Sequence, residues 1–240
     1  MNGFGNDRGK RIFRLLFACN LVLLAICLIQ PVRSGFFRLI TISSLSASLI
    51  GICFLPDRRN LRIALLGGVM ALGVGVGFLP GRSENPMSRD AYVRALRSYI
   101  SVPYVWGGEN ARGVDCSGIV RAAWIDAQLR LGCRKADLRL IRSAIATWWF
   151  DASAKELAAG YRGRTRVLHS APSIRANGDA ELLPGDFAVV ARGVHALAYL
   201  GDGQWIEADP GLQKVVVLQT DGANQWLDSS AVFVRWRQFD

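Results

Sequence analysis

Two residue types in this chain can act together as nucleophile and base, and both are scarce. The 240 residues include five Cys and two His. Cys116 follows a Gly-rich turn and opens an apolar run of helical period, which predicts a helix N-terminus where the dipole and free N–H groups favour a thiolate. His195 begins a short β run that follows a Leu-Pro-Gly-Asp turn and one other strand. A thiol and an imidazole in these positions predict acyl-transfer chemistry through a thioester.

The other Cys and His residues have ordinary explanations. Cys19, Cys27 and Cys53 lie in apolar segments, where a small apolar side chain needs no further role. Cys133 ends a helical run beside basic residues, and His169 lies in a polar stretch interpreted as a solvated loop. With two His and no Cys-x-x-Cys pair, the sequence predicts no metal site, and we expect no cofactor.

The elements around these residues predict helices first and an antiparallel sheet second. Ser88–Ile100 has the pattern of an amphipathic helix with Ser88 as its cap, and a second helix runs from Cys116 to about Leu131. We expect Leu138–Ala159 to be helical and Gly160–Asp179 to be a loop. Short β runs separated by turn residues then follow at Phe187–Ala191, His195–Leu200, Trp205–Ala208, Lys214–Gln219 and Ala231–Trp236. This order indicates an α+β fold.

Two separated motifs resemble a known family. The stretch Pro-Tyr-Val-Trp-Gly-Gly at 103–108, followed by Asp-Cys-Ser-Gly-Ile-Val at 115–120, is similar to the signature of the NlpC family of bacterial cell-wall cysteine peptidases. Leu-Pro-Gly-Asp at 183–186 and His-Ala-Leu-Ala-Tyr-Leu-Gly-Asp-Gly at 195–203 match its second half in order and spacing. The resemblance covers about residues 87–240 and implies a papain-like domain with its nucleophile at a helix N-terminus.

The resemblance also implies roles for particular residues. Cys116 would be the nucleophile and His195 the base. The family's third, orienting residue is usually a His on the next strand, and Glu207 stands at the matching position. A carboxylate can hold the imidazole tautomer and stabilise the imidazolium, so the departure is chemically acceptable. Asp209 is the nearby rival for this role.

Three further positions are implied to bind substrate. Tyr104 would line the site, with a hydroxyl near the scissile carbonyl, and Asp115 and Ser117 would shape the pocket for the N-terminal side of the substrate. The oxyanion would be held most simply by backbone N–H groups where the Cys116 helix begins, as in acyl transfer generally.

The first third of the chain predicts a membrane anchor, residues 1–82, ahead of the catalytic domain at 87–240. The chain is 51% hydrophobic with a mean hydropathy of +0.22, high for a soluble protein. Three apolar stretches, roughly Phe13–Ile29, Leu39–Leu55 and Leu61–Leu79, approach the length that spans a bilayer. Small residues four apart, Ser44 with Ser48 and Gly73 with Gly77, permit close helix association in lipid.

The net charge of +10 is a topology signal. Residues 1–82 carry ten basic and two acidic residues, a net of +8, whereas the rest has a net of +2. This location fits cytoplasmic flanks of membrane helices, and we expect no nucleic-acid partner. Basic residues gather before the first stretch and between the second and third, so three spans would put the catalytic domain outside a bacterial inner membrane, on its periplasmic face. If the second stretch did not span, the domain would face the cytoplasm.

The sequence therefore predicts a membrane-anchored cysteine peptidase or amidase, with a peptidoglycan stem peptide as the implied substrate. Two alternatives remain at this point. One keeps the Cys and His but changes the acceptor, giving a papain-like acyltransferase or lipid amidase. The other is a cell-wall-binding module without turnover, against which the joint presence of nucleophile and base argues.

Overall fold

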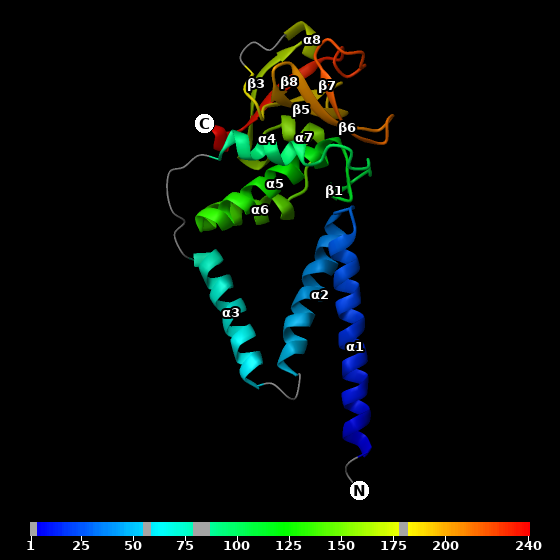
Figure 1. Ribbon diagram of the computed structural model, residues 1–240, viewed down its shortest axis with the longest axis vertical. Helices are drawn as coiled ribbons and strands as arrows, with labels where there is room; N and C mark the ends of the chain where they lie inside the picture. Colours follow the sequence, from blue (N-terminus) through cyan, green and yellow to red (C-terminus); the bar gives the residue numbers. More distant parts are fainter. Residues whose placement is uncertain (1–3, 55–58, 79–86, 178–181) are drawn as a thin grey trace.

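The computed structural model describes residues 4–54, 59–78, 87–177 and 182–240. Three long helices come first: α1 (Phe4–Ile29), α2 (Gly35–Cys53) and α3 (Arg59–Phe78). They extend from one side of a folded domain that contains all the other elements (Figure 1). Helices α4 to α7 lie between these three helices and the sheet, so the molecule has three N-terminal helices, a helical layer and a sheet along its long axis (Figure 1).

The helical layer is built mainly from α4 (Arg89–Arg97), α5 (Cys116–Lys135) and α6 (Leu138–Trp149). The Ser88 hydroxyl accepts the backbone N–H of Ala91 and so caps α4, as its sequence predicts. The stretch expected as one helix over Leu138–Ala159 is two, because Ser153 starts α7 (Ala154–Ala158) with a capping box. The short 3-10 turn η1 (Tyr161–Gly163) follows.

A six-stranded antiparallel sheet forms the second layer, in the order β3-β8-β4-β5-β6-β7. Five of its strands match the expected β runs: β4 (Phe187–Val190), β5 (His195–Gly201), β6 (Gln204–Asp209), β7 (Lys214–Gln219) and β8 (Ala231–Trp236). The expectation of a loop over Gly160–Asp179 is wrong, because this stretch contains β3 (Thr165–Ala171) and α8 (Ile174–Asn177). Pairing with β8 fixes β3 at the sheet edge. A two-stranded hairpin, β1 (Glu109–Asn110) and β2 (Gly113–Val114), precedes α5, and η2 (Arg237–Phe239) follows β8.

The core lies where α4 and α5 pack on one face of the sheet. The rings of Trp124 in α5 and Trp236 in β8 stack at 4.4 Å, and the Tyr92 hydroxyl of α4 donates to the Val120 carbonyl of α5. A second apolar cluster on the opposite face includes Ile174 of α8. This packing holds the N-terminus of α5 against the sheet, at the end where β5 begins.

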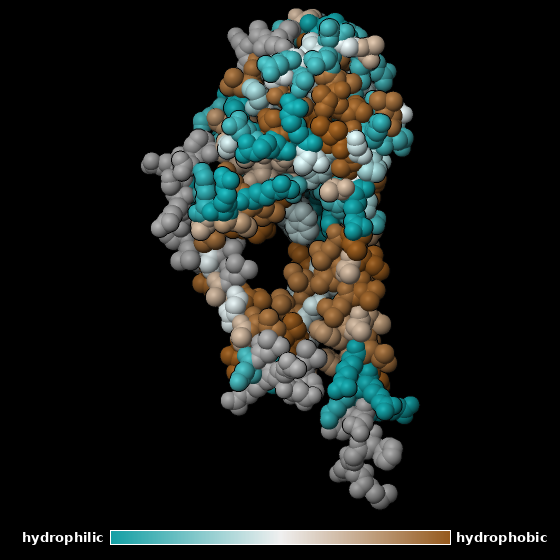
Figure 2. All heavy atoms as spheres, viewed as in Figure 1, coloured by the Kyte–Doolittle hydropathy of each residue, from teal (hydrophilic) through white to brown (hydrophobic). Residues whose placement is uncertain are grey.

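Two of the three N-terminal helices meet the length and apolarity of a membrane span within the described residues: Arg8–Ile29 and Gly35–Cys53. Only 6% of the first is buried, so it is not the core helix of a soluble fold. The third expected span does not meet this test among the described residues, where the apolar stretch of α3 that was found, Arg62–Gly75, is shorter than the about 20 residues that cross a bilayer. Figure 2 shows hydrophobic residues along much of the visible sides of α1 and α2, and hydrophilic residues at the N-terminal end of α1.

Polar side chains join α1 to α2. Two of them, Ser44 and Ser48, have the four-residue spacing that permits close approach of helices. Ser44 and Ser48 both hydrogen bond Asn20 of α1, and the amide of Asn20 also donates to the Ser44 carbonyl. In lipid, such interhelical hydrogen bonds favour association of the two helices. These two serines therefore join α1 and α2 of the same chain.

Candidate active site

Cys116 is the first residue of α5, and the preceding Asp115 caps the helix. The Oδ1 atom of Asp115 accepts the backbone N–H of Gly118 at 2.6 Å and the hydroxyl of Ser117 at 3.0 Å. Asp115 has extended backbone angles, as an N-cap residue requires. The expected pair Asp115 and Ser117 therefore lies beside Cys116, with Asp115 already occupied as a cap.

The loop before Asp115 depends on two glycines, Gly107 and Gly108. Gly107 donates its N–H to Asp115 Oδ2 at 2.8 Å. Its φ of +71° is a left-handed conformation, which glycine tolerates. The Gly108 carbonyl accepts the N–H of Asp115 at 3.1 Å. A Cβ at Gly118 would lie 2.0 Å from that carbonyl oxygen. The two glycines and Gly118 thus bring the loop and the helix start into direct backbone contact.

The Cys116 sulfur lies against the backbone on either side of His195. Sγ is 3.9 Å from the Val194 carbonyl oxygen, and the backbone N–H of Ala196 points to it. Burial, and then the charge of Asp115, raise the pKa of the Cys116 thiol to about 12, although backbone N–H donors oppose the rise. The backbone N–H groups at the helix start favour the thiolate, as the sequence predicts, but desolvation of this buried sulfur outweighs them.

His195 is held by a buried carboxylate and an aromatic ring. Its Nε2–H donates to Oε2 of Glu207, which has no exposed surface. The other oxygen of Glu207 accepts the amide of Asn224 at 2.8 Å. The ring of Trp226 stacks on the imidazole at 4.4 Å and 17°. In the neutral imidazole this contact fixes the proton on Nε2 and leaves Nδ1 as the acceptor.

The two candidates for the third residue differ in what they touch. Glu207 contacts His195, whereas the Oδ1 atom of Asp209 accepts the backbone N–H groups of Gly211 and Leu212 and so shapes a turn. Among the described residues, only Glu207 of this pair bonds the imidazole. Tyr104, the remaining expected residue, is half-buried; burial first, and then Cys116 and Asp115, raise its pKa to about 12, so its hydroxyl stays protonated near neutral pH.

Asn224 and Trp226 are site residues that the sequence did not single out. Both lie between β7 and β8, in a stretch that follows an Asp-Gly turn. The Oδ1 atom of Asn224 accepts the backbone N–H of Trp226 at 2.8 Å, so one residue orients the other. The sequence feature that could have indicated these two residues is a Trp two residues after a turn-forming Asn. A solvated turn has no need of a large aromatic side chain.

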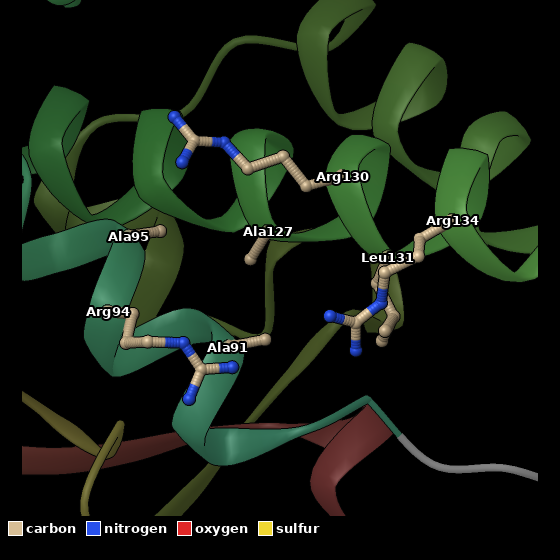
Figure 3. Close-up of a pocket in the computed structure, with 7 residues that line it drawn as sticks. All are labelled: Ala91, Arg94, Ala95, Ala127, Arg130, Leu131 and Arg134. Atoms are coloured by element: carbon tan, nitrogen blue, oxygen red, sulfur yellow. The ribbon is translucent and has the colours of Figure 1, made fainter.

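A separate groove lies between α4 and α5, away from this site. Arg94, Arg130 and Arg134 stand around a floor that includes Ala95 and Ala127 (Figure 3). Arg130 is fourteen residues beyond Cys116 along α5, which at 1.5 Å per residue is roughly 20 Å. The groove therefore does not contact the Cys116 site.

Helix α5 begins with a Cys and packs on an antiparallel sheet in which one strand, β5, begins with a His. These features together define a papain-like α+β fold. The NlpC/P60 family model matches residues 101–232, more than half of the chain, and the chain belongs to the NlpC/P60 family. No protein of curated function matches the chain.

Several solved structures are similar to the chain. The NlpC/p60 domain of the peptidoglycan hydrolase SagA is 24% identical, covers 60% of this chain and 97% of its own, and has a TM-score of 0.35. The peptidoglycan hydrolase RipB of Mycobacterium tuberculosis is 21% identical over 81% of this chain and 84% of its own, with a TM-score of 0.40. An NlpC/P60 family protein of Bacillus cereus is 15% identical over 63% of this chain and 41% of its own, with a TM-score of 0.41.

Proposed function

We propose that this chain is a membrane-anchored cysteine peptidase that hydrolyses an amide bond in the stem peptide of peptidoglycan. The observation that carries the proposal is the buried set of Cys116, His195 and Glu207 in a member of the NlpC/P60 family. Two of the similar structures are peptidoglycan hydrolases, which supports the choice of substrate.

The mechanism starts from a protonated thiol. As Sγ of Cys116 bonds the amide carbon, Nδ1 of His195 takes its proton, and the buried carboxylate of Glu207 stabilises the imidazolium. The backbone N–H groups of Cys116 and Ser117, in the helix turn that lacks intrahelical acceptors, hold the oxyanion. The imidazolium then protonates the leaving nitrogen as the C–N bond breaks, and a thioester remains. Water, deprotonated by His195, cleaves the thioester and releases the acid and the free thiol.

The pocket residues have supporting roles in this proposal. Tyr104 offers a neutral hydroxyl as a hydrogen-bond donor near the scissile carbonyl. Asp115 and Ser117 shape the N-terminal side of the pocket, with Asp115 also holding Gly107 and Gly118 in place.

Replacement of Cys116 tests the reaction. Cys116→Ala should abolish release of new amino groups from purified muropeptides, while Cys133→Ala, a change at an exposed Cys in the same helix, should leave the rate unchanged. Full activity of Cys116→Ala with an unchanged melting temperature would reject the proposal. The acyltransferase and lipid amidase alternatives are tested in the same assay by supplying lipid amides in place of muropeptides.

The anchor should place this domain outside the cytoplasmic membrane. In Figure 1, α1 leads toward the domain, α2 leads away from it and α3 returns, and these directions support an anchor of three crossings. We propose that α3 crosses despite its short apolar stretch, because a bilayer thins around short spans. A topology reporter fused after Asp240 should be active only outside the cytoplasm. A cytoplasmic result would remove peptidoglycan as the substrate.

A further inference from the structure

The segment that connects α1 to α2, residues 30–34, pairs with the loop that precedes the nucleophile. The Pro31 carbonyl accepts the N–H of Glu109 at 3.0 Å, and the N–H of Arg33 donates to the Gly107 carbonyl at 3.2 Å. Val32 and Gly108 form an antiparallel bridge between these two bonds. The connector is therefore an additional short strand beside β1.

Side chains extend this pairing at both ends of the connector. The amide of Asn110 donates to the Gln30 carbonyl at 2.8 Å. The guanidinium of Arg33 donates to the carbonyls of Cys27 and Leu28 at 2.7 and 2.8 Å, which satisfies the free carbonyls at the end of α1. The end of α1, the connector and β1 thus form one hydrogen-bonded unit.

The paired loop is also the loop that holds the start of α5. The carbonyl of Gly107 bonds the connector while its N–H bonds Asp115. The carbonyl of Gly108 bonds the N–H of Asp115 and leaves no space above Gly118. Two glycines therefore separate the connector from the residue that caps α5, and Cys116 comes next in the chain.

A charge network, buried except at Asp151, forms a second link between the anchor and α5. Arg38, in the first turn of α2, is 2% exposed and donates to Glu109 at 2.8 Å. Glu109 also pairs with Arg121, which lies fully buried in α5, five residues after Cys116. Asp151 lies 2.7 Å from Arg121 and 3.7 Å from Arg38.

The charges of this network cancel, two basic against two acidic. Removing Arg38 leaves the buried carboxylate of Glu109 with Arg121 as its one basic partner among the described residues, and loss of a partner from a buried ion pair is strongly unfavourable. The four residues come from α2, β1, α5 and the segment after α6, so the network needs the anchor to be complete. This also explains why an arginine is present at the start of an otherwise apolar helix.

From these contacts we propose that the connector 30–34 and Arg38 are positioning elements of the active site, so that the catalytic unit includes the α1–α2 hairpin. The inference rests on the proposed function for its rate measurements and on the contacts alone for its binding measurement. The domain would then be held against the membrane in one orientation, and the anchor would set the rate as well as the location.

The binding measurement uses the full chain in detergent with a protease site inserted after Ser83. After complete cleavage, the anchor and the catalytic fragment should elute together, because the connector and Arg38 hold them. In Arg38→Met the fragments should separate, with at least a tenfold faster exchange. Arg94→Met, which removes an exposed arginine of α4, is the matched control and should behave as the parent. Immediate separation of the parent fragments would overturn the proposal.

The rate measurement distinguishes positioning from mere stability. In the uncut chain, Arg38→Met should lower kcat on muropeptides about tenfold with KM within twofold, since small misplacements of a nucleophile are costly. Arg38→Lys, which keeps the charge, should recover most of the rate, and Arg94→Met should match the parent. Equal kcat for Arg38→Met and Arg94→Met would overturn the proposal.

A third readout does not depend on the substrate. Iodoacetamide alkylation of Cys116, followed by mass spectrometry, should be faster in Arg38→Met than in Arg94→Met, because loss of the positioning contacts exposes the buried sulfur. If the parent chain hydrolyses no muropeptide, the proposed function fails, while the elution and alkylation results still decide whether the anchor positions Cys116. Equal alkylation rates together with fragments that separate at once would reject the positioning role by itself.

Discussion

The sharpest test of the site concerns Glu207, whose carboxylate has no exposed surface and two hydrogen-bond donors. Glu207→Gln keeps the size of the side chain and removes its charge. If the new amide oxygen accepts from His195, the new amide nitrogen meets the donor nitrogen of Asn224. If the amide is turned around, its nitrogen meets the N–H of His195 instead. Either orientation loses one hydrogen bond as well as the charge.

The expected loss follows from the charge that develops on His195 when it takes the thiol proton. Two unit charges about 4 Å apart attract by about 4 kcal/mol at an effective dielectric constant of about 20. At about 1.4 kcal/mol for each factor of ten, this is a loss in kcat/KM of about 10³. Since both side chains are almost fully buried, solvent screens little of this interaction.

The assay compares Glu207→Gln with Asp209→Asn on purified muropeptides. Asp209→Asn makes the same chemical change two residues along β6, and its remaining oxygen can still accept from Gly211 and Leu212. We expect it to stay within twofold of the parent. A Glu207→Gln variant that folds normally and retains more than a tenth of the parental kcat/KM would refute the orienting role.

Three further results are expected. Trp226→Ala, which removes the ring stacked on His195, should lower kcat/KM about tenfold on muropeptides, while Trp226→Phe should keep most of it; equal losses would exclude stacking as the cause. Asp186→Ala leaves Arg235 without its buried partner and should cost about 3 to 5 kcal/mol of stability in thermal or denaturant unfolding, whereas a change under 1 kcal/mol would contradict this. Because the folded pKa of the Cys116 thiol is about 12 against 9.0 for a free thiol, the folded state retains a proton that the unfolded state loses, so stability relative to Cys116→Ser should fall as pH rises above about 9; a flat difference up to pH 11 would show that burial does not raise this pKa.

Much of the fold was predictable because local patterns and tertiary packing agree. The period of α5 and the alternating runs of β4 to β8 match their final structures. The break between α6 and α7 was not predicted, since it depends on a distant residue: Arg121 of α5 donates to the carbonyls of Thr147 and Phe150 where α6 ends. The edge strand β3 likewise depends on pairing with β8, more than sixty residues later in the chain.

The candidate site divides in the same way. The sequence by itself predicted Cys116 and His195, because only two His are available and His195 is the one that begins a β run after a turn. The family resemblance indicated Glu207 over Asp209 by position. The tertiary structure showed that Glu207 contacts His195. It also brought Asn224 and Trp226 from a turn into the site, and it paired the connector 30–34 with the loop before Cys116. It also buried the Cys116 sulfur, and this burial raises the pKa of the thiol against the backbone N–H donors at the helix start. Residue type and local spacing determine which groups can react, whereas burial and long-range hydrogen bonds, which set pKa and orientation, arise only when distant segments pack together.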